Sequence, residues 1–284
     1  MIKDNTKLEE YLIRGKRVFV KREDTCATYP LPPLAKLRGV YQRLLKVRQD
    51  GYKTVGVFDT KVSMAGYGTG ILAKELGLEC ITFYSGSAEV KANMPPNLIA
   101  AKRTCKEVIP VKPGRTPICY SYAKAHCYHE NIYMMPQGLA CDETSDEVAK
   151  IATGVPKHIL GGSLVMISGT GTIFSGVIKG LQRLPSRLIS ISACISPKKQ
   201  RNNVLKLVGN SQFIYTSVAA AMSTEFIEPI MDYYEEDHYG CPFDCNRHYD
   251  RKAWQWLNEN IDTLPEPILF WNIGGDYDKI FKEN

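Results

Sequence analysis

The chain has 284 residues, 44% hydrophobic and 23% charged, and its 36 basic and 30 acidic side chains give a formal net charge of +6. This composition is ordinary for a soluble globular protein with one large domain or two smaller ones. The mild positive charge permits an anionic partner without requiring one. No apolar run approaches the ~20 residues that a membrane helix needs, so we expect no membrane partner.

The start of the chain and the cysteines indicate a cellular compartment. Residues 1–24 have no apolar segment behind a basic one, so we expect no secretory signal. The nine cysteines are scattered and odd in number, which favours reduced thiols in a cytoplasmic protein over a disulfide framework. The densest group of basic residues, at 196–201, is expected to be a solvated loop.

Strand and helix patterns alternate along the chain. Short apolar runs predict strands at 17–23, 53–59, 79–85, 106–111, 131–136, 163–168, 187–194 and 267–275. Helical spacing of apolar residues, with typical helix-end residues, predicts helices at 34–51, 66–77, 94–105, 117–130, 143–155, 250–261 and directly after Gly171. Such alternation is typical of mostly parallel sheets covered by helices, so the predicted fold class is α/β.

One strand-to-helix turn is rich in glycine and hydroxyl groups. In VMISGTGTIFSGV (165–177) a buried strand is followed by Ser168, Gly169, Thr170, Gly171 and Thr172. Backbone N–H groups of such a turn and the positive end of the helix dipole can bind an anion. The segment lacks the G-K-[ST] of a Walker loop and the spacing of the dinucleotide fingerprint. An ordinary tight turn explains this segment alone equally well.

A second segment, VFVKREDTCATYPLPPLAKLRGVYQRL (18–44), places Lys36 at the start of a helix, behind a proline-rich loop. Here the sequence resembles the fold type II pyridoxal-phosphate (PLP) enzymes, the tryptophan synthase β-like superfamily. It is most similar to the group of 1-aminocyclopropane-1-carboxylate deaminases and D-cysteine desulfhydrases. That group carries KRED, matched by Lys21–Asp24, and then N-K-x-R-K-L, matched by AKLRGV, which puts Lys36 at the Schiff-base position.

Three further segments match the family in the same order. GTGTIFSGV (169–177) matches its GTGGT-like phosphate cup and the GV helix that follows. LFWNIGG (269–275) matches its LF-x-x-x-GG strand near the pyridine ring, and HYDRKAW (248–254) is similar to VYTGKA at the start of its penultimate helix. The resemblance spans residues 17–275, and the order and spacing of the motifs make it specific.

The resemblance implies a two-domain fold in which each domain is a mostly parallel sheet flanked by helices. Residues 1–40 and 150–284 would form a large domain that binds pyridoxal 5'-phosphate, and residues 41–149 a small domain. Because relatives are usually dimers, it also implies a homodimer with a small amino-acid-like substrate.

The resemblance also implies roles for individual residues. Lys36 would hold the cofactor as an internal aldimine and then move a proton at the substrate's α or β carbon. The cofactor-binding residues would be Lys36, Ser168, Gly169, Thr170, Gly171, Thr172, Asn272 and Gly274, with the neutral Asn272 facing the pyridine nitrogen. The substrate and its carboxylate would contact Ser63, Met64, Ala65, Gly66 and Tyr67. Ser63 and Tyr249 join Lys36 as candidate catalytic residues.

Each of these residues also has a structural interpretation. Lys36 could lie on the surface of an amphipathic helix, and Ser63 could cap the helix that follows it. Tyr67 and Tyr249 could be core aromatics, and Asn272 could form a hydrogen bond at a strand end. The glycine turn favours the catalytic interpretation of Lys36.

The sequence departs from the group's pattern beside the cofactor ring. The group's SNH turn aligns with VSMAGYG (62–68), where Ser63 matches but Met64 replaces the asparagine that contacts the ring oxygen. Ala35 replaces the asparagine before the lysine. These departures argue against simple deaminase activity.

The segment HYGCPFDCNRH (238–248) contains histidines and cysteines, which are possible metal ligands. The spacing of His238, Cys241, Cys245 and His248 is compatible with zinc. A loop near the mouth of the active site, without a metal, is the favoured interpretation.

Three functions are open at this point. The first is a PLP enzyme, lyase or deaminase-like, that acts on an amino acid or amino-acid-like group by elimination, deamination or decarboxylation through Lys36. The second is a PLP enzyme that acts on an amino-acid-modified base in phage-type hypermodified DNA, with nucleic acid as a partner and binding that weakens as salt rises. The third is a non-catalytic cofactor-binding protein, which requires an unreactive Lys36.

Overall fold

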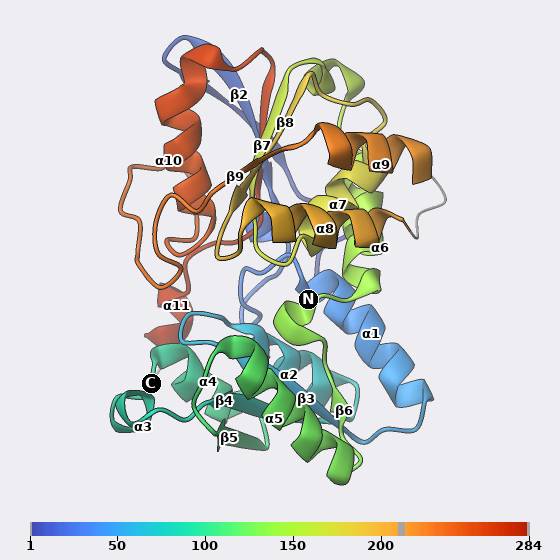
Figure 1. Cartoon of the computed structure of the whole chain (residues 1–284), viewed down its shortest axis with the longest axis vertical. Coiled ribbons are helices and arrows are strands. Elements are labelled where there is room, and N and C mark those ends of the chain that lie inside the picture. The colour runs from blue at the N-terminus through green and yellow to red at the C-terminus, as the bar shows by residue number, and fades with distance from the viewer. Residues whose placement is uncertain (1, 210–213, 283–284) are drawn as a thin grey trace. The chain divides into compact units, whose positions relative to one another are not determined.

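The computed structural model describes residues 2–209 and 214–282, and its elements group into two compact units (Figure 1). The first unit contains the segment ending at Thr28, then Pro33–Lys36 and Asp142–Asp276. The second contains Tyr29–Pro32, Leu37–Cys141 and the segment beginning at Tyr277. No helix in the described ranges is long and apolar enough to cross a membrane.

The sheet of the first unit has six strands in the order β1-β2-β10-β7-β8-β9. Their bounds are Leu8–Ile13 (β1), Lys16–Arg22 (β2), Ser163–Ser168 (β7), Arg187–Ser192 (β8), Glu225–Ile227 (β9) and Ile268–Asn272 (β10). β1 and β2 form an antiparallel hairpin, and every other neighbouring pair is parallel. Parallel strands covered on both faces read as continuous apolar runs, and β7 and β10 are buried along their whole length.

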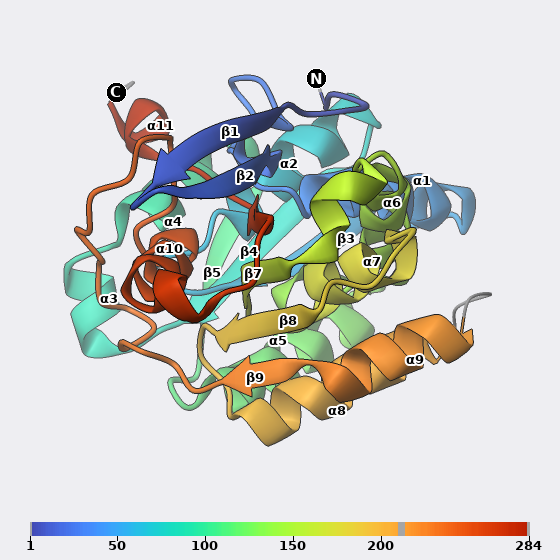
Figure 2. The same cartoon turned by 90° about the horizontal axis from the view of Figure 1, so that it is seen from above.

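Helices cover both faces of this sheet, as Figure 2 shows. One face packs against α6 (Asp142–Thr153), α7 (Thr172–Gly180), α8 (Pro197–Val208) and α9 (Ile214–Ser223), and the other against α10 (Asp250–Asn260). Successive strand residues point to opposite faces, so Leu164 and Met166 join the first core and Val165 and Ile167 the second. Because β2, β10, β7 and β8 are parallel, the residues that follow them lie along one edge of the sheet.

The second unit contains a four-stranded parallel sheet in the order β5-β4-β3-β6. Its strands are Thr54–Asp59 (β3), Glu79–Ser85 (β4), Glu107–Val111 (β5) and Tyr133–Met134 (β6). Its helices are α1 (Leu37–Gln49), α2 (Ala65–Glu75), α3 (Ala88–Ala92), α4 (Pro96–Thr104), α5 (Thr116–His129) and α11 (Asp278–Phe281). Ile81 and Phe83 of β4 pack against α5, and a separate core joins α2 to α4. Short 3-10 helices lie at Glu23–Thr25, Gln137–Leu139, Lys157–Gly161 and Ile261–Thr263.

The predicted fold class is confirmed, because both sheets are mostly parallel and flanked by helices. Every predicted strand is present, although the one expected at 131–136 is reduced to Tyr133–Met134. The sequence interpretation missed β1, β9 and helices α3, α8, α9 and α11. It was wrong about residues 196–201, which begin α8: Ser196 takes the N-cap position and Pro197 the first helical position, where proline's fixed φ suits a helix.

The units divide the chain at places other than the expected boundaries after residues 40 and 149. The helix α6 belongs to the first unit because Val148 and Ile151 pack in one core with Phe174 of α7. The last helix, α11, belongs to the second unit, where Ile280 packs near Tyr67. The domain boundaries of 1–40, 41–149 and 150–284 stay a prediction.

Candidate active site

The glycine turn joins β7 to α7 at the carboxyl edge of the first unit's sheet. Gly171 adopts a left-handed conformation (φ +87°) at the N-cap position of α7, as glycine readily does. The hydroxyl oxygens of Thr170 and Thr172 lie 2.9 Å apart in a hydrogen bond. The first N–H groups of a helix lack partners within the helix and carry partial positive charge, so the start of α7 offers donors to an anion.

The space around this turn fits a phosphate group. A Cβ atom placed on Gly169 would meet no atom of the described residues within 4 Å. A Cβ atom on Gly171 would lie 2.9 Å from Cγ2 of Val204 in α8, so that side of the turn is filled. Ser168, the last residue of β7, is buried beneath the turn. The backbone is therefore accessible on one side and supported on the other, as close approach of a phosphate requires.

Gln200 of α8 supports the turn and was not predicted from the sequence. This fully buried side chain donates from Nε2 to the carbonyl oxygen of Ser168 at 3.1 Å and to Oγ of Ser190 at 2.9 Å. The backbone N–H of Ala193 donates to the same Ser168 carbonyl at 2.9 Å. The end of β7 is thus fixed to both β8 and α8. The segment that contains Gln200 is the one interpreted as a loop.

Lys36 lies immediately before α1, in a segment that pairs with the chain just beyond β10. The backbone N–H of Ala35 donates to the carbonyl oxygen of Ile273 at 3.1 Å. Leu34 forms an antiparallel bridge with Gly274. These contacts hold the half-buried Lys36 and the predicted cofactor residue Gly274 at the carboxyl end of β10.

Positive charge gathers beyond the end of β8, near Cys194. Burial raises the pKa of the Cys194 thiol, and the ammonium groups of Lys36, Lys199 and Lys252 oppose that rise. Each of these lysines acts electrostatically on the thiol of Cys194, which lies between β8 and α8 in the chain. Lys252 is buried and donates from Nζ to the carbonyl oxygen of Asp232 at 2.5 Å, and burial lowers its pKa. The ammonium groups of Lys36 and Lys199 favour an anionic ligand, whereas Asp232, Glu235 and Asp237 act on Lys252 with negative charge.

Asn272, the last residue of β10, is fully buried and donates from Nδ2 to the carbonyl oxygen of Asp244 at 2.8 Å. Its Oδ1 has no hydrogen-bond partner within the described ranges, and neither has Oδ2 of the neighbouring Asp250. The other oxygen of Asp250 accepts from the N–H of Ile273 at 2.8 Å. Burial raises the pKa of Asp250 well above its ordinary value, which favours the protonated carboxyl. The end of β10 therefore offers an amide oxygen and a carboxyl oxygen to a bound ring.

Tyr249 precedes α10 at its N-cap position. Its hydroxyl forms a short hydrogen bond with the hydroxyl of Tyr233, and the two rings pack edge to face with centroids 5.6 Å apart. The pair holds the Tyr249 hydroxyl in a fixed position. Its catalytic role stays a prediction.

The turn between β3 and α2, in the second unit, contains the predicted substrate-binding residues. Oγ of Ser63 accepts from the N–H of Ala65 at 3.2 Å, but Met64 occupies the N-cap position of α2 and no side chain caps the helix. Asp59, the last residue of β3, also occupies this turn: Oδ2 accepts from the N–H of Gly66 at 2.8 Å and Oδ1 from the N–H of Thr60 at 3.1 Å. Burial raises the pKa of Asp59 to about 7. The sequence analysis missed Asp59, which ends β3 and precedes the start of α2 by six residues.

The side chains of Met64 and Tyr67 are buried in the core between α2 and α4. The guanidinium of Arg103 lies 5.7 Å from the centre of the Tyr67 ring, and burial raises the pKa of the Tyr67 hydroxyl. This environment is that of a core aromatic, one of the two interpretations considered. Met64 could contact a substrate only through its backbone.

The structure thus places the predicted residues in two groups. Lys36, the glycine turn, Asn272, Gly274 and Tyr249 belong to the first unit, where the ends of β7 and β10 carry most of them. The segment 63–67 belongs to the second unit and follows β3. Both groups follow carboxyl ends of parallel strands, the position at which open α/β sheets bind ligands.

The four residues considered for zinc do not form a metal site. Across residues 2–209 and 214–282, no three His, Cys, Asp or Glu side chains are placed to hold a metal ion. Nε2 of His238 and Nε2 of His248 lie 3.9 and 3.6 Å from the carboxylate oxygens of Glu236. In this segment the side chain of Cys245 lowers the pKa of the Cys241 thiol.

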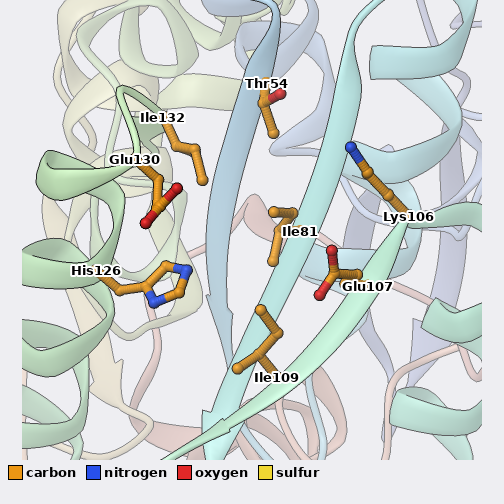
Figure 3. Close-up of a pocket in the computed structure, with 8 residues that line it drawn as sticks. All are labelled: Thr54, Ile81, Lys106, Glu107, Ile109, His126, Glu130 and Ile132. Atoms are coloured by element: carbon orange, nitrogen blue, oxygen red, sulfur yellow. The ribbon is translucent and has the colours of Figure 1, made fainter.

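A hollow of about 370 Å³ lies elsewhere in the second unit (Figure 3). It is lined by Thr54, Ile81, Lys106, Glu107, Ile109, His126, Glu130 and Ile132. Thr54 and Glu107 are the first residues of their strands, so the hollow lies at the amino end of the sheet. That end is opposite to the one at which parallel sheets bind ligands, and we do not assign the reaction to it.

Known proteins resemble the chain in sequence and in fold. It is 30% identical to the glycyl-dTMP PLP-dependent decarboxylase of Pseudomonas phage M6, over 96% of this chain and 100% of that protein. A solved structure of an ACC deaminase homologue matches with a TM-score of 0.72 at 20% identity, covering 98% of this chain and 94% of that one. Processed threonine deaminase isoform 2 from Solanum lycopersicum matches with a TM-score of 0.65 at 13% identity, covering 99% and 82%. No protein-family profile matches the chain.

Proposed function

The chain belongs to the fold type II family of PLP-dependent enzymes, and from this premise we propose that it removes the carboxyl group of an amino acid carried by a nucleotide base. It is a PLP-dependent enzyme that acts on an amino acid or amino-acid-like group by elimination, deamination or decarboxylation. The observation that carries the choice of decarboxylation is the full-length match, at 30% identity, to a phage protein named as a glycyl-dTMP decarboxylase.

The residues of the first unit support binding of this cofactor. We assign the phosphate to the glycine turn, where Gly169 leaves room and α7 supplies N–H donors. We assign the ring nitrogen, in its protonated form, to Asn272, because the buried and unpaired Oδ1 can only accept a hydrogen bond. When bound, the cofactor supplies an electron sink for the bond that breaks beside the substrate's amino group. Lys36, which follows the segment Leu34–Ala35 that pairs with Ile273 and Gly274, is the amine assigned to attach the cofactor.

Decarboxylation replaces a carbon–carbon bond by a carbon–hydrogen bond. The carboxyl group departs as CO₂ and leaves an electron pair at the α carbon, which must then receive a proton. We assign this proton to Nζ of Lys36, which becomes available once the substrate's amine has displaced it. The buried Asp250 accepts from the N–H of Ile273 through Oδ1 and would contact the ring side of the site through Oδ2, which has no partner in the described residues.

The first experiment tests Lys36 and the reaction together. We expect the purified enzyme to show a visible absorption band with PLP, to retain the cofactor covalently after borohydride reduction, and to release CO₂ from glycyl-dTMP. Lys36→Ala should lose all three properties, whereas the matched variant Lys46→Ala, an exposed lysine on α1, should keep them. If Lys36→Ala retains the covalent cofactor, the assignment of Lys36 is wrong. If the loaded wild type releases CO₂ from no nucleotide, the decarboxylation proposal is wrong.

Modified DNA, rather than a mononucleotide, is the second candidate substrate. The net charge of +6 and the exposed Lys198 and Lys199 at the start of α8 favour a polyanion. Each phosphate neutralised by a lysine makes binding weaker as salt rises. We therefore expect steep salt dependence for DNA, reduced in Lys198→Ala/Lys199→Ala. Equal salt dependence for DNA and for the mononucleotide would exclude the polymer.

A further inference from the structure

Asn246, in the loop before α10, forms hydrogen bonds with the two glycines just beyond β10. Its backbone N–H donates to the carbonyl oxygen of Gly274 at 3.1 Å, and its side-chain Nδ2 donates to that of Gly275 at 3.0 Å. The residue is 2% exposed, so both bonds lie away from water, where an unsatisfied polar group is costly. Asn246 therefore holds one edge of the segment 273–275.

The opposite edge of the same segment holds the residues that precede Lys36. The N–H of Ala35 donates to the carbonyl oxygen of Ile273 at 3.1 Å, and the N–H of Gly275 donates to that of Pro33 at 3.2 Å. Gly275 thus donates to the lysine segment and accepts from the asparagine. All of these residues belong to the first unit, so the three segments form one continuous hydrogen-bonded layer within it.

Asn246 also forms hydrogen bonds with the start of α10. Its backbone carbonyl accepts from the N–H groups of Tyr249 at 3.2 Å and Arg251 at 3.0 Å, and its Oδ1 accepts from the N–H of His248 at 3.0 Å. These partners determine which way the amide faces. Exchanging its oxygen and nitrogen would set oxygen against the Gly275 carbonyl and N–H against the His248 N–H. One side chain thus connects the lysine segment with the start of the helix.

The two ends of the amide have separable roles. The bond from the N–H of His248 to Oδ1 is an Asx turn, which aspartate forms as readily as asparagine. The bond to Gly275 needs a donor, and a carboxylate has none. Asn246→Asp would therefore keep the turn before α10 and set two oxygens against each other at Gly275. A residue whose only role is the turn would tolerate this exchange.

We propose that Asn246 is a positioning residue that fixes the Lys36 segment against the start of α10. The inference rests on the proposed function, in which Lys36 attaches the cofactor and later delivers a proton to the α carbon. Proton delivery requires a donor within hydrogen-bond reach of the acceptor, and a misplacement of about 1 Å can lower a rate about 100-fold. Asn246 acts on this step only through the backbone, because its amide bonds to Gly275 and His248.

The first test measures hydrogen–deuterium exchange in the cofactor-free chain by mass spectrometry. In Asn246→Asp we expect the peptides that cover 33–36 and 273–276 to exchange at least about ten-fold faster than in wild type. The reason is that the N–H groups of Ala35 and Gly275 lose protection when the layer loosens. A role confined to the turn before α10 would leave both peptides at the wild-type rate.

Asn258→Asp is the matched control. Asn258 is 7% exposed, and its Nδ2 donates to the carbonyl oxygen of Trp254 at 2.8 Å, within α10. This variant removes a buried donor of the same kind whose bond stays inside one helix, so exchange at 33–36 should stay at the wild-type rate. If Asn246→Asp fails to fold, Asn246→Ser decides, because the serine hydroxyl can form the same turn while the amide nitrogen is lost.

The kinetic readout separates positioning from a general loss of stability. We expect Asn246→Asp to lower kcat for CO₂ release at least about ten-fold and to change KM by less than about three-fold, whereas Asn258→Asp should keep both values. A merely structural role would raise exchange throughout the first unit, and equally in both variants. Exchange at 33–36 that rises no more in a folded Asn246 variant than in Asn258→Asp overturns the inference. Faster exchange with an unchanged kcat overturns it as well.

The outcomes distinguish this inference from the proposed function. Release of CO₂ by wild type tests the function, whereas the exchange measurement needs neither cofactor nor activity. Faster exchange in a protein that decarboxylates nothing would overturn the function and leave Asn246 as a support of the lysine segment. Exchange at the wild-type rate in an active decarboxylase would overturn the inference alone.

Discussion

The backbone N–H of Ala35 donates to the carbonyl oxygen of Ile273 at 3.1 Å, so the residue before Lys36 is bonded to the residue after Asn272. Two predicted cofactor residues from opposite ends of the chain are thereby positioned by one antiparallel contact. Gly274 lies within this contact, where a Cβ atom would be 3.1 Å from the carbonyl oxygen of Pro33. The position of Lys36 therefore depends on a small residue at 274.

We expect Gly274→Val to displace the segment that carries Lys36. The added methyl groups would press on the backbone of Pro33 and on Asp250, whose Oδ2 lies 3.5 Å from the Cβ position. Overpacking of this kind costs about 1–3 kcal/mol in the free energy of unfolding. The fraction of protein that carries borohydride-fixed cofactor, measured by mass spectrometry, should fall several-fold.

Gly240→Val is the control for this prediction. A Cβ atom on the exposed Gly240 would meet nothing within 4 Å in the part of the chain that the structure describes. Cofactor fixation should remain at the wild-type level. Equal losses in the two variants would mean that valine acts through general destabilisation and not through Lys36.

Gly169→Ala should separate phosphate binding from stability. Open space borders Gly169, so we expect the free energy of unfolding of the cofactor-free chain to change by less than about 0.5 kcal/mol. The methyl group would occupy the space that we assign to the phosphate, so the Kd for PLP should rise at least about ten-fold, or roughly 1.4 kcal/mol. Fluorescence titration with PLP measures this effect.

Gly171→Ala provides the contrast within the same turn. Its φ of +87° and the nearby Val204 should make this variant less stable by about 1–2 kcal/mol even without cofactor. If Gly169→Ala binds PLP as tightly as wild type, the phosphate does not lie against this turn.

The local parts of the site could be predicted from the sequence. The turn from β7 to α7 is specified by neighbours in the chain, since an apolar strand, two glycines and a helix signal lie within 165–177. Lys36 carries no local signal of its own, and only the order of motifs along the chain identified it. Gln200 could not be predicted, because its contact with Ser168 joins residues 32 positions apart on different elements.

The sequence analysis missed β1 and β9 for one physical reason and Asp59 for another. β1 and β9 are edge strands with partly exposed residues, so they lack the continuous apolar run of a central strand. Asp59 ends β3 and its partners follow within seven residues, so it is a local feature. The family pattern drew attention to Ser63 and not to the acid that precedes it.

Stability should depend on pH through Asp59. Burial raises its pKa in the folded chain to about 7, against an ordinary value of 3.8. The folded state therefore holds this proton more tightly than the unfolded state. The contribution of this proton to the free energy of unfolding is complete below about pH 4. It is lost as pH rises to about 7, and the free energy of unfolding then falls by up to about 1.4 kcal/mol per pH unit. Denaturant unfolding as a function of pH measures it.

Asp59→Asn cannot ionise, so its unfolding free energy should decline less than that of wild type over this pH range. The charge of Asp59 raises the pKa of the thiols of Cys80 and Cys105, and the substitution leaves both thiols in place. Asp142→Asn, which removes an exposed carboxylate from the start of α6, should retain the wild-type pH profile. Parallel profiles for Asp59→Asn and wild type would show that Asp59 ionises normally in the folded chain.

The hydrogen bond between Tyr233 and Tyr249 allows a catalytic hydroxyl to be distinguished from a structural one. Tyr249→Phe and Tyr233→Phe break the same bond and leave the edge-to-face rings in place, so their effects on stability should be similar, about 1 kcal/mol. If the Tyr249 hydroxyl moves a proton, kcat should fall at least about 100-fold in Tyr249→Phe and far less in Tyr233→Phe. Steady-state kinetics at several pH values measures the difference, and equal losses of kcat would assign both tyrosines to the support of α10.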